Sequence, residues 1–363
     1  MKTKNLFLAV FILGIISWSC SNKNLSTTTT SASLKSSLTS SITALTTAVN
    51  KISSSAGYQV LAGPTDLITK SAVVSPLDTL SHSILLSDIA GVYDYKATTV
   101  TIGSHSILQF FTKTADNAQM IVRLPQEKVN ASRKLLKYTP GDTLLTNNYV
   151  VTLSEYVYNF KYFSAWDYKM ASAIAVKDVD VGVLSIQSSN NQTSGYQFAS
   201  QFKFPSGYIT KCTFTSGDTA ICDYTISDGT KILYEEKYTA VKSNSELRHR
   251  ERAFSLTIGN VLIERNAGSD QTLDSVKVYV DGVLQLNSKV DIVDNSSDTT
   301  DRCVTNKKRE LKITFDDGTS ATITELAGQV ITDISTLFTS MRQSYFATGI
   351  IDWIAWDIFL SKQ

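Results

Sequence analysis

The sequence has few of the residues that usually carry catalysis or bind metals. Its three histidines, His82, His105 and His249, form no His-Glu-x-x-His motif, and no Gly-x-Ser-x-Gly motif occurs. The four cysteines include no Cys-x-x-Cys pair, which argues against a zinc site and against a thioredoxin-type redox centre. We therefore predict no metal site and no cofactor, and the sequence identifies no catalytic residue.

Charge is also scarce. Charged residues make up 18% of the chain, below the usual quarter, and the net charge is +1. Without a basic excess there is no electrostatic reason to expect nucleic acid as a partner. Polarity comes instead from Ser, Thr and Asn, which suit strands and turns, and hydrophobic residues at 42% suffice for a core. This composition predicts a folded, β-rich globular protein.

The chain lacks an apolar run long enough to span a membrane, which takes about 20 residues in a helix. The run Leu6–Ile16 follows two lysines and leads through small polar residues to Cys20. This is the layout of an export signal. We predict that residues 1–19 are a signal peptide and that Cys20, exposed by cleavage, carries a lipid anchor. The alternative is plain secretion with an ordinary cysteine at this position.

Residues 20–56 are predicted to form a Ser/Thr-rich tether followed by an amphipathic helix. The tether has the composition of a flexible linker. Apolar residues then recur at steps of three and four, which places on one helix face Leu34, Leu38, Ile42, Leu45, Val49 and Ile52. Because Ser and Thr are mediocre helix formers, we expect this helix to dock on the domain. A coiled coil with a partner is the alternative.

Residues 57–329 are predicted to be an antiparallel β domain. Apolar and polar residues alternate in successive runs from Tyr93 to Glu325, with hairpin-type turns at 227–230, 280–283 and 316–319. No long helical pattern separates the runs, which argues against parallel crossover units. We predict an α+β fold that is mainly antiparallel β. Curved or meandering sheets would carry an N-terminal helix and C-terminal helices packed on them.

Residues 330–363 are predicted to be helical. A first helix would present the stripe Val330, Ile334, Leu337, Phe338 and Met341. The apolar segment that follows carries only two charges, Asp352 and Asp357, and is too short and too charged to span a membrane. We expect it to pack across the sheet. The alternative is contact with a membrane surface through Trp353 and Trp356.

The cysteines other than Cys20 are three, an odd number for a disulfide-permissive compartment. The stretch CTFTSGDTAIC reads as a hairpin turning at residues 216–218, which would place Cys212 directly opposite Cys222. We expect either a disulfide between these two, worth about 3 kcal/mol if it is unstrained, or two half-buried thiols. Cys303 would then remain free.

The stretch Ser200-Gln201-Phe202-Lys203 fits Ser-x-x-Lys, the nucleophile motif of penicillin-recognising enzymes. That motif needs a helix, in which Ser and Lys share one face. The surrounding alternation instead predicts a strand, which sends Ser200 and Lys203 to opposite sides of a sheet. We therefore interpret the motif as structural.

Two charged clusters are explained more simply by structure than by ligand binding. The first is an acidic loop formed by Asp294, Asn295, Asp298 and Asp301. It lacks the spacing and the glycine of an EF-hand, so we predict a solvated loop rather than a calcium site. The second is formed by Arg248, Arg250 and Arg252. These arginines alternate along one predicted strand, where they would protect a sheet edge.

Two aromatic stripes are the strongest functional signal. Each occupies alternate positions of one predicted strand, and the members are Tyr156, Tyr158, Phe160 and Tyr162 in the first and Tyr196, Phe198, Phe202 and Phe204 in the second. Such stripes usually build a core. Buried tyrosines nevertheless need partners for their hydroxyls, and the mixture also suits a sheet face that holds a lipid tail or stacks on a sugar. Core and ligand surface both remain open.

The segments ILLSDIAGVYDYKA, FKFPSGYITKCTF and VKVYVDGVLQLNSKV resemble those of an uncharacterised group of Bacteroidota envelope lipoproteins. The loose signal before Cys20 and the polar residues after it are similar to theirs. The resemblance implies a lipid-anchored, β-rich protein of the cell envelope, at the outer membrane, and it transfers no catalytic residue. We expect a binding or structural role with a lipid or glycan ligand. The alternative is a hydrolase of envelope glycans or esters.

Overall fold

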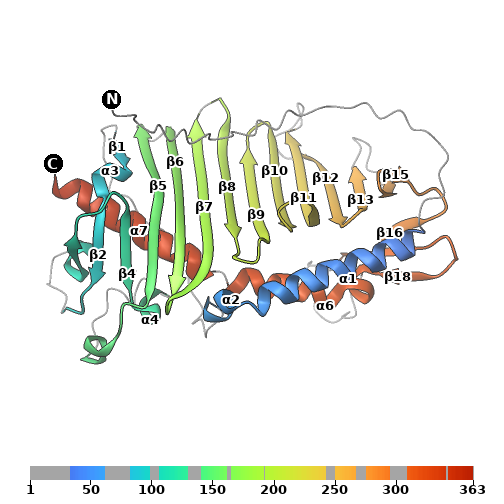
Figure 1. The fold of residues 1–363 in the computed structure, drawn as a ribbon. Helices are drawn as coiled ribbons and strands as arrows, with labels where there is room; N and C mark the ends of the chain where they lie inside the picture. Colours follow the sequence, from blue (N-terminus) through green and yellow to red (C-terminus); the bar gives the residue numbers. More distant parts are fainter. Residues whose placement is uncertain are drawn as a thin grey trace, which may run out of the picture. The chain divides into compact units, whose positions relative to one another are not determined.

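The alternating segments form one large sheet, and the prediction of an α+β fold with mainly antiparallel strands is confirmed (Figure 1). The structure is a computed structural model and describes residues 33–61, 82–98, 106–129, 140–161, 165–191, 193–242, 250–266, 275–294, 309–340 and 342–362. Cys20, Tyr162 and Cys303 lie outside these residues.

The large sheet has 15 strands. They are β1 (His82–Leu85), β2 (Gly91–Tyr95), β3 (Phe111–Ala115), β4 (Met120–Leu124), β5 (Tyr149–Lys161), β6 (Ala165–Val176), β7 (Val179–Asn191), β8 (Gly195–Lys203), β9 (Ile209–Ser216), β10 (Thr219–Ser227), β11 (Ile232–Lys242), β12 (Arg250–Ile258), β13 (Val261–Asn266), β14 (Ser275–Val280) and β15 (Val283–Leu284). From β4 to β15 every strand pairs antiparallel with the next one in the chain. This is the predicted meander.

One edge of the sheet departs from the meander. The strand β2 lies between β3 and β4, so β2 and β4 run parallel, which the sequence analysis does not predict. No crossover helix is needed, because the short link between β3 and β4 passes the start of β2, where the Gly91 amide donates to the Gln119 carbonyl. On the other side of β4, strand β5 is long enough to pair with β4 along its first half and with β1 along its second.

The predicted hairpin turns are present. Asp281 and Gly282 both have positive φ, as in a two-residue hairpin turn between β14 and β15. The turn at 316–319 joins β17 and β18 of a second, three-stranded sheet, which consists of β16 (Lys289–Asp294), β17 (Arg309–Thr314) and β18 (Ser320–Thr322).

The helices are α1 (Leu34–Ser53), α2 (Ala56–Leu61), α3 (Leu86–Ile89), α4 (Gln126–Val129), α6 (Ile323–Ser340) and α7 (Arg342–Ser361), with 3-10 turns η1 (Ile107–Phe110) and η2 (Pro140–Leu144). The helix α6 begins at Ile323, inside a segment that the alternation predicts to be a strand. The carboxylate of Glu325 accepts from the Thr322 amide and the Thr322 hydroxyl accepts from the Glu325 amide, and these reciprocal bonds start the helix early.

Two hydrophobic cores lie on one face of the large sheet. The first joins strands β1 to β8 with α7, and the second joins β10 to β14 and the small sheet with α1 and α6. Figure 1 shows α7 crossing behind β1 to β7, whereas α1 and α6 run along the lower ends of the later strands. The prediction that the C-terminal segment packs across the sheet is confirmed, since Ile350, Ile351 and Ile354 of α7 are buried in the first core.

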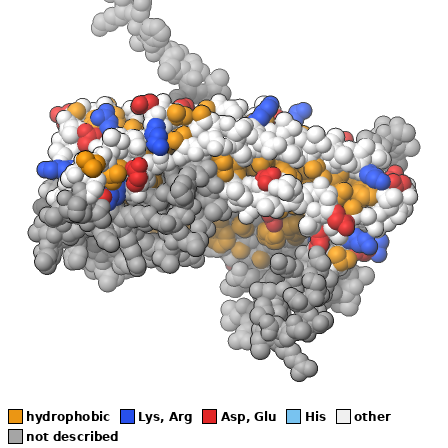
Figure 2. All heavy atoms as spheres, turned by 90° about the horizontal axis from the view of Figure 1, so that it is seen from below, with side chains coloured by type: hydrophobic (Ala, Val, Ile, Leu, Met, Phe, Trp, Pro, Cys, Tyr) orange, Lys and Arg blue, Asp and Glu red, His pale blue; other side chains and the backbone are white. Residues whose placement is uncertain are grey.

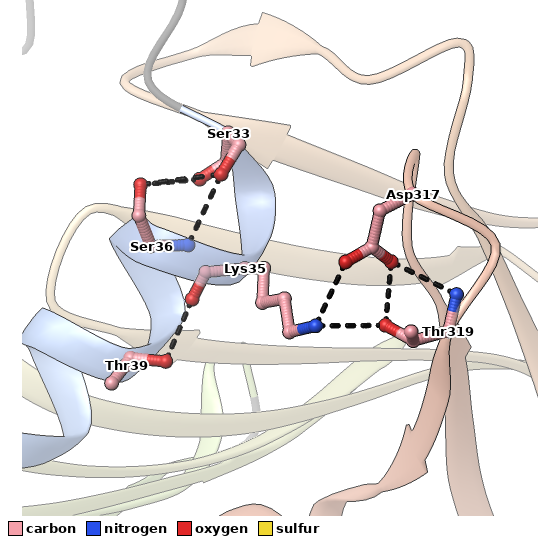
Figure 3. Close-up of polar contacts among 6 residues, drawn as sticks. All are labelled: Ser33, Lys35, Ser36, Thr39, Asp317 and Thr319. Atoms are coloured by element: carbon pink, nitrogen blue, oxygen red, sulfur yellow. Dashed lines mark hydrogen bonds and ion pairs between the residues drawn. The ribbon is translucent and has the colours of Figure 1, made fainter.

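The helix α1 spans the predicted stripe and buries all of its members except Ile42, which is half-buried. Four of its apolar side chains belong to the second core, and Ile52 near its end belongs to the first. Ser33 caps its start by accepting from the Ser36 amide (Figure 3). Lys35 donates to Asp317 at 2.8 Å and to Thr319 at 2.9 Å, which ties the helix to the turn of the small sheet.

The surface reflects the low charge of the sequence. Seen from below, scattered charged side chains stand among uncharged polar ones, and hydrophobic side chains gather in a hollow (Figure 2). Among the described residues, no helix is long and apolar enough to cross a membrane.

Candidate functional site

The hairpin registers align one residue of each strand into a row across the sheet. From β5 to β14 each member lies directly opposite the next, and the members are Tyr158, Tyr168, Ser188, Phe198, Phe214, Cys222, Tyr238, Phe254, Arg265 and Val276. We call this set the aromatic row. Because alternate residues of a strand share a face, its side chains lie on the face that carries both cores.

Burial falls steeply toward the aromatic row. A second row lies on the same face, two residues from the aromatic row along each strand, and is mostly buried. Its members are Tyr156, Met170, Ile186, Ser200, Cys212, Tyr224, Glu236, Leu256, Ile263 and Val278. The following row, which includes Leu184, Phe202 and Tyr234, is buried. No member of the aromatic row is buried, although most are apolar. The aromatic row is therefore the margin at which the covering helices end.

The first part of the aromatic row lies under α7. Asp352 of this helix is half-buried, and its Oδ1 accepts from the hydroxyl of Tyr156 at 3.1 Å and from that of Tyr168 at 2.9 Å. Burial of the carboxyl group raises its pKa to about 6, although the two hydrogen bonds act in the opposite direction. Burial also raises the pKa of both tyrosines well above the ordinary value. Their hydroxyls thus have the partner that buried tyrosines need.

The later part of the aromatic row is open. Cys222 is exposed, Tyr238 is 50% exposed, and Phe214 and Phe254 are half-buried. The rings of Tyr238 and Phe254 lie 5.0 Å apart, and the ring of Phe214 lies 5.8 Å from that of Tyr196. The rings thus contact one another along the sheet rather than a covering helix.

A groove of about 280 Å³ opens between two of these rings. Phe214 on β9 and Tyr238 on β11 flank it, and Cys222 on β10 lies between them. Its other residues include the small side chains Ala220 and Ala240, which leave room above the strands. The lining is largely apolar, so the groove can take an apolar group and has little to offer a charged one.

Glu236 holds the tyrosine of the groove in place. Its Oε1 accepts from the Tyr238 hydroxyl at 2.5 Å and its Oε2 from the Tyr234 hydroxyl at 3.1 Å. All three residues alternate along β11 and therefore share the face of the groove. Burial and the bond to Glu236 raise the pKa of Tyr238 well above the ordinary value. The ring of Tyr238 is thus fixed although half of its surface is exposed.

The opposite face of the same strands is polar. The residues that alternate with the aromatic row form a second line across the sheet, made of Lys169, Gln187, Ala199, Thr213, Asp223, Lys237, Ser255, Glu264 and Lys277. An aromatic row on one face and a polar line on the other is the pattern of a sheet with only one apolar side. The open rings are therefore confined to the face that the helices partly cover.

The two predicted stripes divide between core and open surface. Tyr156, Phe202 and Phe204 are buried in the first core. Tyr158 and Phe198 are half-buried against that core, and Phe160 and Tyr196 are half-buried at its margin. Three of the eight predicted residues therefore belong to the core, two pack against it and two stand at its margin.

The open groove lies on residues that the sequence analysis does not single out. None of Phe214, Tyr238 and Phe254 belongs to a run of alternating aromatic residues in its own strand. Trp166, whose ring lies 5.9 Å from that of Tyr196, is likewise not predicted. The predicted stripes follow single strands, whereas the open surface runs across strands. Its only signal in the sequence is the set of turn lengths that fixes the register between strands.

The predicted register of the cysteine hairpin is wrong. Cys212 lies opposite Tyr224, and Cys222 lies opposite Phe214, because the turn is centred one residue later than predicted. The two cysteines are therefore diagonal neighbours, and both are free thiols. Burial raises the pKa of Cys212, and the nearby Cys222 raises it further. Diagonal positions are farther apart than the directly opposite positions that the predicted bridge requires.

The remaining predicted sites are the Ser-x-x-Lys motif and the two charged clusters. Ser200 is buried and Lys203 is exposed, so they lie on opposite faces as predicted and form no catalytic pair. The predicted loop of Asp294, Asn295, Asp298 and Asp301 and the three arginines lie largely outside the described residues. Within the part of the chain that the structure describes, no group of three or more His, Cys, Asp or Glu side chains could hold a metal ion.

No family model, no curated protein and no solved structure matches this chain. The function is therefore inferred from the aromatic row and its groove.

Proposed function

We propose that the protein is a binding protein of the cell envelope, held at the membrane by a lipid on Cys20. Its ligand would insert an apolar group into the groove between Phe214 and Tyr238. The observation that carries the proposal is an apolar groove whose Tyr238 wall is 50% exposed and fixed by Glu236. Isolated exposed apolar side chains are common, but a contiguous row that forms a groove marks an interaction site.

The groove can supply useful affinity without rearrangement. An aromatic side chain buries roughly 200 Å², so covering the exposed half of Tyr238 removes roughly 100 Å² from water and contributes about 2 kcal/mol. The bond to Glu236 already restricts the tyrosine, which lowers the entropy cost of binding. Loss of this ring should weaken an apolar ligand about thirtyfold.

Binding can be tested with the hydrophobic dye 8-anilinonaphthalene-1-sulfonate. The full mature chain carrying Cys20→Ser should increase the dye's fluorescence, and Phe214→Ala combined with Tyr238→Ala should remove most of the increase. Tyr279→Ala is the matched control, because Tyr279 is a half-buried tyrosine on the opposite face. Equal dye binding by the groove variant and the control, with unchanged circular dichroism, would contradict the proposed site.

The envelope address rests on residues 1–20 and is tested separately. With Cys20 intact, the protein should sediment with membranes and incorporate a fatty-acid probe. Cys20→Ser should release it into the soluble fraction and abolish labelling. An unchanged distribution of the variant would contradict the anchor and would leave the groove proposal standing.

A hydrolase of envelope glycans or esters is the second candidate, and one observation favours it. Asp223 on β10 and Glu235 on β11 lie on the polar face as diagonal neighbours, two residue pairs apart in the ladder. Burial raises the pKa of both carboxyl groups, and Asp223 also raises that of Glu235. Two such carboxyls could divide acid and base roles. Asp223→Asn should abolish any hydrolysis of envelope glycan, whereas the groove variants should leave hydrolysis unchanged.

A further inference from the structure

The groove differs from a general apolar patch in its width, direction and ends. Its walls, Phe214 and Tyr238, stand on the two strands that flank β10, so the space between them runs parallel to β10. Neighbouring strands lie about 4.8 Å apart, which puts the strands that bear the two walls about 10 Å apart. The thickness of the two side chains takes up much of this distance. What remains admits a single narrow chain.

The two ends of the groove are unequal. Toward the cores, the next residue of β10 on this face is Tyr224, whose ring lies 6.2 Å from that of Tyr234 and which is half-buried. Toward the turn at residues 217–218, the next residue is Ala220, whose methyl group leaves the groove open. A ligand therefore enters beside Ala220 and ends against Tyr224.

The groove also continues an interface that exists within the protein. The same aromatic row is covered by α7 at Tyr158 and Tyr168, and the row next to it is largely buried along the sheet. The groove is thus formed by aromatic side chains like those that α7 covers in the first part of the aromatic row. Its volume of about 280 Å³ lies just below the range of sites for drug-sized ligands.

We propose that the groove takes one unbranched acyl chain, which lies along β10 over Cys222 with its polar head at the Ala220 end. A fused-ring ligand such as a sterol or bile acid is too wide for a slot two strands across. A sugar would leave its hydroxyls against apolar side chains without partners. This inference rests on the proposed function and specifies its ligand.

Cys222 provides a direct readout, because the bound chain would cover its exposed thiol. Decanoate is the probe, and iodoacetamide alkylation of Cys222, followed by peptide mapping of the full mature Cys20→Ser chain, is the measurement. At about ten times its dissociation constant, decanoate should slow alkylation roughly tenfold, because only the free fraction reacts. Cholate, a bile acid that is too wide for the groove, is the comparison ligand. It should leave the rate of Cys222 alkylation unchanged, even where it binds elsewhere on the apolar surface.

Ala220→Phe closes the open end and should abolish protection by decanoate. Ala199→Phe, on the polar face, is the matched control and should retain it. Protection by cholate equal to that by decanoate, or protection that survives Ala220→Phe in a folded variant, would overturn the inference. Dye binding that depends on Phe214 and Tyr238, without protection by decanoate, would overturn the acyl chain and leave the proposed function intact. Loss of both signals would overturn both.

The source of the acyl chain is distinguished by the same readout. If a free fatty acid or a lipid of another molecule is the ligand, decanoate protects the Cys20→Ser chain and the lipidated protein alike. If the protein's own anchor occupies the groove, Cys222 of the lipidated protein in detergent is already protected without decanoate. Either result supports the acyl chain, and reactive Cys222 in both forms at saturating decanoate contradicts it.

Discussion

The covered and open parts of the aromatic row lie on different strands of one sheet and share the same alternation and the same residue types. They differ in where the polar partner of the tyrosines comes from. Under α7, Tyr156 and Tyr168 donate to Asp352, a residue of the covering helix. In the open part, Tyr238 and Tyr234 donate to Glu236, a residue of their own strand. A tyrosine whose hydroxyl is satisfied within its strand can keep its ring exposed without a covering element.

The largest expected difference is between two phenylalanines on neighbouring strands of the same face. Phe202→Ala removes a fully buried ring from the first core and should lower the free energy of unfolding by about 3–5 kcal/mol. Phe214→Ala removes a half-buried ring and should cost about 1 kcal/mol. Urea unfolding of both variants measures the contrast. Equal costs would show that the open part of the row is packed like the core.

The second contrast concerns the pH dependence of stability that the covered part contributes through Asp352. A carboxyl whose pKa is raised in the folded protein holds its proton more tightly there than in the unfolded chain. The contribution of Asp352 to stability is therefore fully present below its unfolded pKa of 3.8 and is lost as pH rises through about 6. The loss amounts to at most about 3 kcal/mol.

The measurement is the free energy of unfolding between pH 4 and pH 8. Asp352→Asn should flatten the fall in stability over this range and should be at least as stable as the wild type at pH 8. The exposed Asp316→Asn is the matched control and should keep the wild-type profile. A variant profile parallel to that of the wild type would show that α7 docks without a buried carboxylate.

A smaller contrast compares how much the hydrogen bonds to Asp352 and to Glu236 contribute to the free energy of unfolding. Tyr168→Phe leaves the half-buried Asp352 with one hydrogen bond and should cost about 1–3 kcal/mol at pH 8. Tyr238→Phe releases Glu236, which is nearer to solvent, and should cost about 0.5 kcal/mol. Unfolding curves of the two single variants test this order. The ligand groove should lose only a small part of its affinity in Tyr238→Phe, because the ring remains and only its restriction by Glu236 is lost.

The smallest effect concerns a turn in the covered part. Lys177 and Asp178, between β6 and β7, both have positive φ without a glycine, at 51° and 61°. Asp178→Gly should raise the free energy of unfolding by about 0.5–1 kcal/mol, because glycine adopts this region without strain. Gly282, which already occupies such a turn between β14 and β15, gives the reverse test, since Gly282→Ala should destabilise by a similar amount.

The alternation of single segments predicts the strands, and the spacing of three and four predicts α1 and its buried face. Both depend on neighbours in the sequence, so they can be read from it. The aromatic row depends instead on the register between strands. Because the turn is centred one residue later than predicted, the residue opposite Cys212 is Tyr224 instead of Cys222. The Lys177–Asp178 turn carries no glycine to mark it. The groove could therefore not be predicted, although every residue that forms it could be placed on a strand.

The position of α1 in the chain has a consequence for the order of folding. This helix is the first described element, yet its apolar stripe is buried against strands β11 to β13 and helix α6, which lie in the C-terminal half of the chain. Lys35 and Asp317, which join its start to the small sheet, are 282 residues apart. The hairpins of the meander can form one after another as the chain emerges, because their contacts are local. The stripe of α1 must wait for the C-terminal half, and until then it remains an exposed amphipathic segment that other apolar surfaces can bind.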